Sequence, residues 1–188
     1  MPRLPRILYA RAYYHVYNRG VEKRLIYLDH SDRRVFLSLL REYVISFRIN
    51  LFAYCLMDNH FHFYLQTQTD NLDKFMHKLI GRYVQYFNSR YNRVGPLFQS
   101  RYKSKLVEAD SQSLTLIKYI HNNPVVEGLA GIPEEYPWSS YQIYMGMRKD
   151  ETWLNYKWVL DQFAETSTAS TPQNLFKDFH QVPGGPGP

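Results

Sequence analysis

Hydrophobic and polar residues alternate strictly along residues 60–66 (HFHFYLQ), and this period of two predicts a β-strand with one buried face. The preceding residues, 51–57, are apolar almost throughout, as in a central strand. Asp58 and Asn59 are expected to form the turn that joins these two strands into a hairpin. Two further strands are predicted, at residues 13–18 and 102–108.

Apolar residues spaced three and four apart predict three helices, at residues 32–47, 72–90 and 111–122. Ser31 is the expected N-cap of the first helix, and Asp110 or Ser111 that of the third. The predicted order of elements is therefore β-α-β-β-α-β-α. This order indicates an α+β fold of the ferredoxin-like or split β-α-β type, an antiparallel sheet with helices on one face and one extra helix.

One folded unit is expected over residues 1–160, because a chain of 188 residues suits a single domain with an appended segment. The stretches AETSTASTPQ and VPGGPGP are typical of flexible chain, so residues 161–188 are predicted to be a C-terminal tail. No apolar run approaches the roughly 18 residues that a membrane span needs, and the N-terminus lacks the apolar stretch of a secretory signal. A cytoplasmic protein without membrane contact is therefore expected.

Composition narrows the possible functions. Hydrophobic residues make up 45% of the chain and aromatic residues 16%, which is too many for a disordered protein. A single cysteine excludes a disulfide framework and a zinc site built on several thiolates. The chain is therefore expected to hold any metal ion with side chains other than thiolates.

Positive charge is concentrated in one part of the chain. The formal net charge is +6, but residues 74–105 carry eight Lys and Arg and no acidic residue. Aromatic residues are interleaved with these cations, a mixture that suits phosphate neutralisation and base stacking. An ordinary basic surface is the alternative interpretation. The candidate DNA-binding residues are Arg82, Arg90, Arg93, Arg101, Lys103 and Lys105.

The sharpest chemical feature is the pair His60 and His62 within the alternating strand. Side chains two residues apart in a strand project from the same face, about 6 to 7 Å apart at their roots, so the two imidazoles can share one metal ion. Phe61 and Phe63 would then point into the helix-covered core, which leaves the histidines on the open face of the sheet. Two surface histidines that bind nothing are the alternative.

The third predicted helix carries a second pair, Tyr119 and Asn123. At a spacing of four residues, their side chains meet on one flank of the helix, away from the centre of its buried stripe. A phenol and an amide oxygen that face two histidines can form a nucleophile and part of a metal site. The alternative for Asn123 is structural, because it precedes Pro124 and an Asn-Pro pair can cap a following turn.

Five segments in colinear order resemble the REP-associated tyrosine transposases, which belong to the single-tyrosine HUH superfamily and are similar to the transposases of IS200/IS605 elements. The resemblance covers about residues 8–145. The segments that carry it are YHVYNRG (14–20), MDNHFHFYLQ (57–66), YFNSRYNRVGPLFQSRYKS (86–104), YIHNNPVVEGL (119–129) and YPWSSY (136–141).

The resemblance implies the role of each site residue. His60 and His62 match the histidines that bind a divalent ion, Tyr119 matches the nucleophile, and Asn123 matches the polar residue that completes the metal site. Insertion-sequence relatives commonly have Gln in place of Asn123, and many relatives have Pro in place of Asp58. The ion implied is Mg²⁺ or Mn²⁺. The implied reaction cleaves and rejoins single-stranded DNA at hairpin-forming palindromes through a 5′-phosphotyrosine, carried out by a monomer or a homodimer.

Two other functions fit parts of this pattern. A noncatalytic nucleic-acid-binding module uses the same order of elements, with aromatic residues on an open sheet that stack bases. A metal-dependent nuclease that activates water is the second, with Asp58 as the nearest candidate carboxylate. Tyr83 and Tyr86 are rival nucleophiles, but they lie within an apolar stripe and are predicted to be core residues. His15 and His121 are candidate neighbours of the site or of DNA, with a solvated or internally bonded histidine as the alternative.

Overall fold

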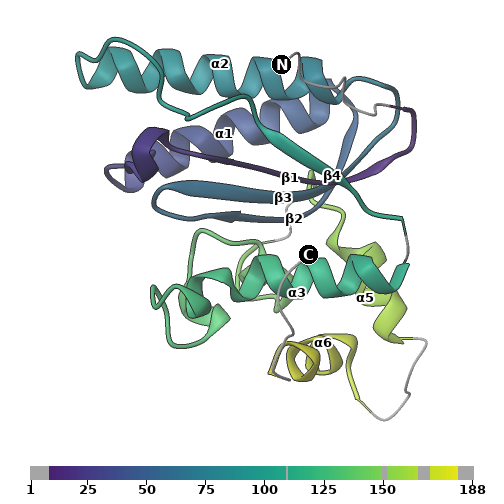
Figure 1. Ribbon diagram of the computed structural model, residues 1–188. Coiled ribbons are helices and arrows are strands. Elements are labelled where there is room, and N and C mark those ends of the chain that lie inside the picture. Colours follow the sequence, from purple (N-terminus) through teal and green to yellow (C-terminus); the bar gives the residue numbers. More distant parts are fainter. Residues whose placement is uncertain (1–8, 109, 150–151, 165–169, 182–188) are drawn as a thin grey trace.

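The computed structural model describes residues 9–108, 110–149, 152–164 and 170–181. Four strands form an antiparallel sheet in the order β2-β3-β1-β4 (Figure 1). The strands are β1 (Tyr13–Arg19), β2 (Ile49–Leu56), β3 (His60–Thr67) and β4 (Lys103–Leu106). All four lie where the hydrophobic pattern predicted them, and the predicted α+β fold is confirmed.

Helices α1 (His30–Ser46) and α2 (Leu72–Arg90) cover one face of the sheet, and α3 (Asp110–Val126) lies against the other (Figure 1). The C-terminal helices α5 and α6 lie on the same side as α3. The remaining elements are η1 (Val21–Lys23), η2 (Pro133–Glu135), α4 (Tyr141–Tyr144), α5 (Tyr156–Ala164) and α6 (Pro172–Gln181). Within the described part of the chain, no helix has the length and apolar character needed to cross a bilayer.

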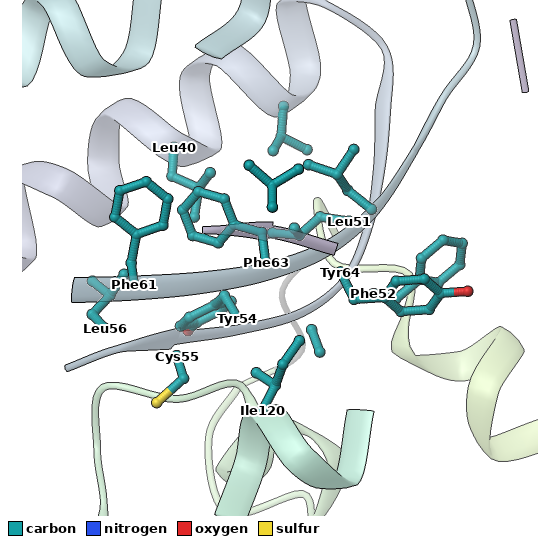
Figure 2. Packing of buried hydrophobic residues seen from close by; sticks show 14 of the residues in the cluster. Leu40, Leu51, Phe52, Tyr54, Cys55, Leu56, Phe61, Phe63, Tyr64 and Ile120 are labelled. Atoms are coloured by element: carbon teal, nitrogen blue, oxygen red, sulfur yellow. The ribbon is translucent and has the colours of Figure 1, made fainter. Parts of the chain in front are cut away.

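Aromatic side chains fill the core between the sheet and α1. Phe36 of α1 has its ring centroid 5.4 Å from that of Phe61 and 6.2 Å from that of Phe63, and all three are fully buried. Figure 2 shows Phe61 and Phe63 on the α1 side of the sheet, while Ile120 of α3 lies on the opposite side. The face expected to be open is therefore covered by α3, and the histidines on it are buried rather than exposed.

Helix α1 begins two residues earlier than predicted, because Asp29 and not Ser31 is its N-cap. The Asp29 carboxylate accepts a hydrogen bond from the Asp32 backbone N–H at 3.0 Å, and the Asp32 carboxylate accepts one from the Asp29 N–H at 3.4 Å. This reciprocal arrangement satisfies two N–H groups at once, which a serine inside the first turn cannot do.

Helix α3 continues past the predicted end at residue 122, with Pro124 inside it. The proline removes one backbone N–H donor, but the bond from Glu127 N to Asn123 O keeps the helical spacing past it. The helix ends only afterwards, where Gly128 has a φ of 71° and Leu129 N donates to Pro124 O. Asn123 therefore stays one turn beyond Tyr119 on the same helix. The cap of a new turn, which was the structural alternative for Asn123, does not form.

The predicted flexible tail is wrong for the part of it that the structure describes. Helix α5 extends to Ala164, and α6 packs against α3 and α5. Phe176 of α6 is fully buried and stacks on Tyr144, with ring centroids 4.6 Å apart. The helix was not predicted because its short amphipathic segment, LFKDFH, lies between two turn-rich stretches of sequence. The apolar face of this segment finds a surface to pack against only in the folded protein. Residues 165–169 and 182–188 of the expected tail lie outside the described residues.

Candidate active site

Strand β3 brings His60 and His62 to the face that α3 covers. Their ring centroids are 5.0 Å apart with the planes perpendicular, and each side chain is only 6% exposed. The alternation of β3 accounts for this placement, since Phe61 between them points to α1. The prediction that the two imidazoles share one face is confirmed.

Hydrogen bonds orient both imidazoles. His60 Nδ1 donates to Asn59 Oδ1 at 2.7 Å, which leaves His60 Nε2 with a free lone pair. His62 Nδ1 lies 2.9 Å from His15 Nε2, so Nε2 is the nitrogen of His62 that stays available. His15 thus contacts the site as a hydrogen-bonded neighbour of His62, which was one of its two predicted interpretations.

Burial keeps both histidines neutral. It lowers the pKa of His60 to about 4, with a smaller contribution from Arg19. Burial also lowers the pKa of His62 well below its usual value, and the neighbouring His15 and His60 add to the effect. Neutral imidazole is the form that donates a lone pair to a metal ion, so the pair is ready for coordination at neutral pH.

Helix α3 places Tyr119 and Asn123 opposite the histidines. The Tyr119 ring meets His62 edge-on, with centroids 5.5 Å apart and an interplanar angle of 84°. Asn123 is 6% exposed and its Nδ2 lies 3.4 Å from the Tyr119 carbonyl oxygen, a weak contact that leaves Oδ1 as the free acceptor. These residues line one cavity of about 230 Å³ together with His60. The structure therefore brings together all four residues that the sequence placed in the site.

The chemistry of the donor set suits a divalent cation with open positions. Two imidazole nitrogens and one amide oxygen are a mixed set that Mn²⁺ accepts and that Mg²⁺ can share with water and phosphate oxygens. Among the described residues, no group of three His, Cys, Asp or Glu side chains is arranged to hold a metal ion. A site here therefore depends on Asn123, or on groups from the substrate, to supplement the histidines.

Several cavity residues were not predicted from the sequence, and Glu127 is the most notable. Its Oε1 lies 3.7 Å from His60 Nε2, one turn beyond Asn123. The repeat of four residues from Tyr119 to Asn123 to Glu127 is the signal that could have revealed it. The other unpredicted lining residues are Tyr17, Asn18, Arg19 and Gln99.

Strand register explains why Tyr17 and Lys103 belong to this cavity. Tyr17 of β1 is paired with His62 on one side and with Lys103 on the other. The Tyr17 ring stacks on His62 with centroids 5.7 Å apart, and Lys103 Nζ lies 5.9 Å from the Tyr17 ring centroid. The positive charge of Lys103 on β4 is therefore separated from the histidines on β3 by the Tyr17 ring on β1.

The predicted DNA-binding residues fall into two groups. Arg101, Lys103 and Lys105 are exposed along β4 and the residue pair before it, and Lys103 lines the cavity. The other three lie on or just after α2, on the opposite face of the sheet. There, Arg82 donates to Gln85 at 3.1 Å, and the Arg93 guanidinium lies 5.5 Å from the Phe87 ring centroid.

Arg90 does not fit the predicted role. Its guanidinium pairs with Asp29 at 2.6 Å and with the fully buried Asp32 at 2.8 Å, and it donates to Tyr86 Oη at 2.7 Å. Two carboxylates therefore neutralise this charge within the protein. The sequence did not reveal the pairing because Arg90 lies 58 residues from Asp32.

The rival nucleophiles lie outside the cavity. Tyr83 is fully buried and donates its hydroxyl to the Ile26 carbonyl, which confirms it as a core residue. Tyr86 Oη contacts Asp32 at 3.1 Å, within the polar cluster between α1 and α2. Both lie on the far side of the sheet from His60 and His62.

The chain matches the family of IS200-like transposases over residues 9–123. No curated protein sequence matches it significantly. Among solved structures, a REP-associated tyrosine transposase bound to a REP hairpin is similar in fold, with a TM-score of 0.64, 13% identity, and coverage of 78% of this chain and 86% of that one.

Two further structures are similar with lower scores. A putative transposase from Deinococcus radiodurans R1 has a TM-score of 0.44 and 17% identity, covering 65% of this chain and 97% of that one. The tRNA(His) guanylyltransferase of Saccharomyces cerevisiae has a TM-score of 0.49 and 9% identity, covering 97% and 76%. The family match spans more than half of the sequence, from β1 to Asn123, and agrees with the motifs. The chain therefore belongs to the IS200-like transposase family and is a DNA transposase.

Proposed function

We propose that this transposase cleaves and rejoins single-stranded DNA beside hairpin-forming palindromes, with Tyr119 as the nucleophile and a divalent ion at His60, His62 and Asn123. The observation that carries the proposal is the position of the Tyr119 ring, edge-on to the buried and neutral His62 across one cavity. The likeness in fold to a REP-associated transposase that binds a REP hairpin supports the choice of hairpin DNA as the partner.

A bound Mg²⁺ or Mn²⁺ would polarise the scissile phosphate and stabilise the charge that develops during displacement. The two histidines would hold it through their Nε2 atoms and Asn123 through Oδ1. His15 keeps His62 oriented for this task through their 2.9 Å hydrogen bond. Arg19 and Lys103 line the same cavity and would supply positive charge for the phosphate.

Tyr119 would carry the covalent step. Its Oη attacks the phosphorus, a P–O bond to the phenol forms, and the bond to the 3′ oxygen of the preceding nucleotide breaks. The products are a 5′-phosphotyrosine and a free 3′-hydroxyl, so the phenolic proton is released as the 3′ oxygen gains one. Because one phosphate ester replaces another, attack by a 3′-hydroxyl on the phosphotyrosine reseals the strand without an external energy source.

The test is a search for the covalent adduct. We expect the full chain, incubated with end-labelled hairpin DNA carrying single-stranded flanks and with Mn²⁺, to form a DNA adduct that survives a denaturing gel. Tyr119→Phe should abolish the adduct while hairpin binding changes little, because only one oxygen is removed. Tyr86→Phe is the matched control and should retain the adduct.

Three other results would contradict this proposal. An adduct in Tyr119→Phe would show that another residue is the nucleophile. Cleavage without any adduct would indicate a nuclease that activates water. Hairpin binding with no metal-dependent cleavage would indicate a binding module.

A further inference from the structure

A second concavity, of about 730 Å³, lies on the α2 side of the molecule between that helix and Ser100–Tyr102, the residues that lead into β4. Apolar atoms form most of its surface, contributed by Phe47, Met76, Ile80 and Tyr102. We refer to this concavity as the α2 groove. It is distinct from the catalytic cavity, with which it shares no lining residue.

Cations surround the apolar part of the α2 groove. Lys74, Lys78 and Arg101 line it and are exposed, whereas Asp73 is the one acidic side chain among its lining residues. In the part of the chain that the structure describes, none of these three cations forms an ion pair with a carboxylate. Apolar surface beside unpaired cations is the chemistry that binds a nucleobase together with its neighbouring phosphates.

Gly81 contributes to the open shape of the α2 groove. It lies in the interior of α2, lines the groove, and a Cβ added there would meet no atom within 4 Å. Glycine destabilises a helix interior relative to alanine, and no close packing or positive φ requires it at this position. The absence of a side chain instead leaves the groove open to an external group.

The α2 groove and the catalytic cavity lie on either side of one short segment. Gln99 and Lys103 line the cavity, and the three residues between them line the groove. Five residues span less than about 18 Å even when extended. One short single-stranded segment of DNA can therefore reach from the cavity to the groove.

We propose that the α2 groove binds an unpaired nucleobase from the single-stranded flank of the substrate, within a few nucleotides of the scissile phosphate. Lys74, Lys78 and Arg101 then contact the adjacent phosphates. This inference rests on the proposed function in taking single-stranded DNA as the substrate. The unpaired cations favour DNA over a second copy of this chain, whose own charge is also positive.

The test compares two substitutions of Gly81 in the full chain. Affinity for a fluorescent hairpin with single-stranded flanks is measured by anisotropy in EDTA, and abasic sites are placed singly along each flank. In the wild type, one flank position should lose about 10-fold in affinity when its base is removed. Gly81→Trp fills the groove, so it should weaken binding of the intact strand by a similar factor and become insensitive to that abasic site.

Gly81→Ala is the control, because it adds one methyl group in open space and favours the helix. It should bind DNA like the wild type and melt at the same or a higher temperature. A second variant, Lys74→Ala with Lys78→Ala, avoids any effect of the bulky tryptophan on folding. In a plot of log affinity against log salt, the slope of this variant should be less steep by about 1.4, because each phosphate contact on a single strand contributes roughly 0.7 to the slope.

The proposal is overturned if Gly81→Trp keeps both the wild-type affinity and the wild-type abasic profile, or if the lysine variant keeps the wild-type salt slope. A groove that seats a second copy would reveal itself through a dimer that Gly81→Trp dissociates, with DNA affinity unchanged. The adduct assay separates this proposal from the catalytic one. A normal adduct with these binding results negative disproves the groove alone, whereas a missing adduct disproves the catalytic mechanism whatever the groove does.

Discussion

Single residues in the catalytic cavity differ in how firmly they are held. His60 and His62 each have one ring nitrogen engaged, by Asn59 and His15 respectively, so their free nitrogens are fixed in direction. Asn123 has only a 3.4 Å contact to the Tyr119 carbonyl. We therefore expect the two imidazoles to contribute most of the metal affinity and the Asn123 amide to contribute less.

Metal binding by variants tests this ranking directly. We expect His62→Ala to abolish detectable Mn²⁺ binding in calorimetry or electron paramagnetic resonance, and Asn123→Ala to weaken it less. His15→Phe should weaken it about 10- to 100-fold, since the loss of a hydrogen-bonded neighbour misorients a metal ligand. His15→Gln keeps a polar partner and should recover part of the affinity.

His30 provides the control, because it is an exposed histidine at the start of α1, away from the cavity. His30→Phe should bind Mn²⁺ like the wild type. Undiminished Mn²⁺ affinity in His15→Phe would mean that His15 does not orient His62. Undiminished affinity in Asn123→Ala would mean that the amide is not a ligand.

At the scale of elements, helix α6 packs against α3, the helix that carries Tyr119. His180 Nδ1 donates to the Phe176 carbonyl at 2.8 Å, and its Nε2 lies 3.2 Å from Nδ1 of His121 on α3. His121 Nε2 in turn lies 2.7 Å from Ser140 Oγ, which accepts from the Tyr54 N–H of β2. One chain of hydrogen bonds therefore connects α6, α3 and the sheet, two residues from Tyr119.

This contact predicts a loss of stability in acid. Burial lowers the pKa of His180 to about 4, with nearby Lys118 adding to the effect. The unfolded chain protonates this residue near pH 6.5, so it binds more protons than the folded chain below that pH. The contribution of neutral His180 is therefore complete above about pH 6.5 and decreases as pH falls toward 4, by roughly 3 kcal/mol in total.

Thermal melts between pH 7 and 4.5 check this prediction. His180→Phe retains an apolar ring of similar size and should show a shallower fall in melting temperature than the wild type. The difference between the two curves therefore reports the titration of His180 together with its contact to His121. Parallel curves would show that His180 titrates as freely in the folded chain as in the unfolded one.

At the scale of the whole molecule, the basic residues divide according to whether the fold neutralises them. Lys103 and Lys105 stand exposed on the edge strand β4, where Lys103 lines the cavity, and Arg101 stands exposed just before β4, where it lines the α2 groove. Arg90, from the same basic stretch of sequence, is paired with Asp29 and Asp32 between α1 and α2. Cations of the first kind are available for phosphates, and Arg90 is not.

Salt dependence of DNA binding distinguishes these two kinds of cation. Replacing Arg101, Lys103 and Lys105 with Ala should flatten the plot of log affinity against log salt by about two, because each lost phosphate contact removes roughly 0.7 on a single strand. Arg90→Ala should leave the slope unchanged but lower the melting temperature, since the buried Asp32 loses its charged partner. An unchanged slope in the triple variant would show that β4 does not contact DNA.

Sequence patterns alone predicted much of the fold and the four central site residues. The alternation of HFHFYLQ placed His60 and His62 on one face, and the spacing of four residues placed Tyr119 and Asn123 on one flank of α3. The direction of a side chain within one strand or helix follows from the periodicity of that element, so a few neighbouring residues are enough to predict it. The length of α3 past Pro124 was missed, because the helix tolerates one lost hydrogen bond where its neighbours pack well.

Tertiary structure alone decided what surrounds those residues. The cover of α3 over the histidines, the docking of α6 and the pairing of Arg90 with Asp32 all join residues far apart in sequence. Strand register, not local pattern, brought Tyr17 and Lys103 beside His62. Burial, charge neutralisation and cavity shape are properties of the packed chain. The residues proposed to do the chemistry could therefore be predicted from sequence, whereas their burial, charge and neighbours were decided only when the elements packed together.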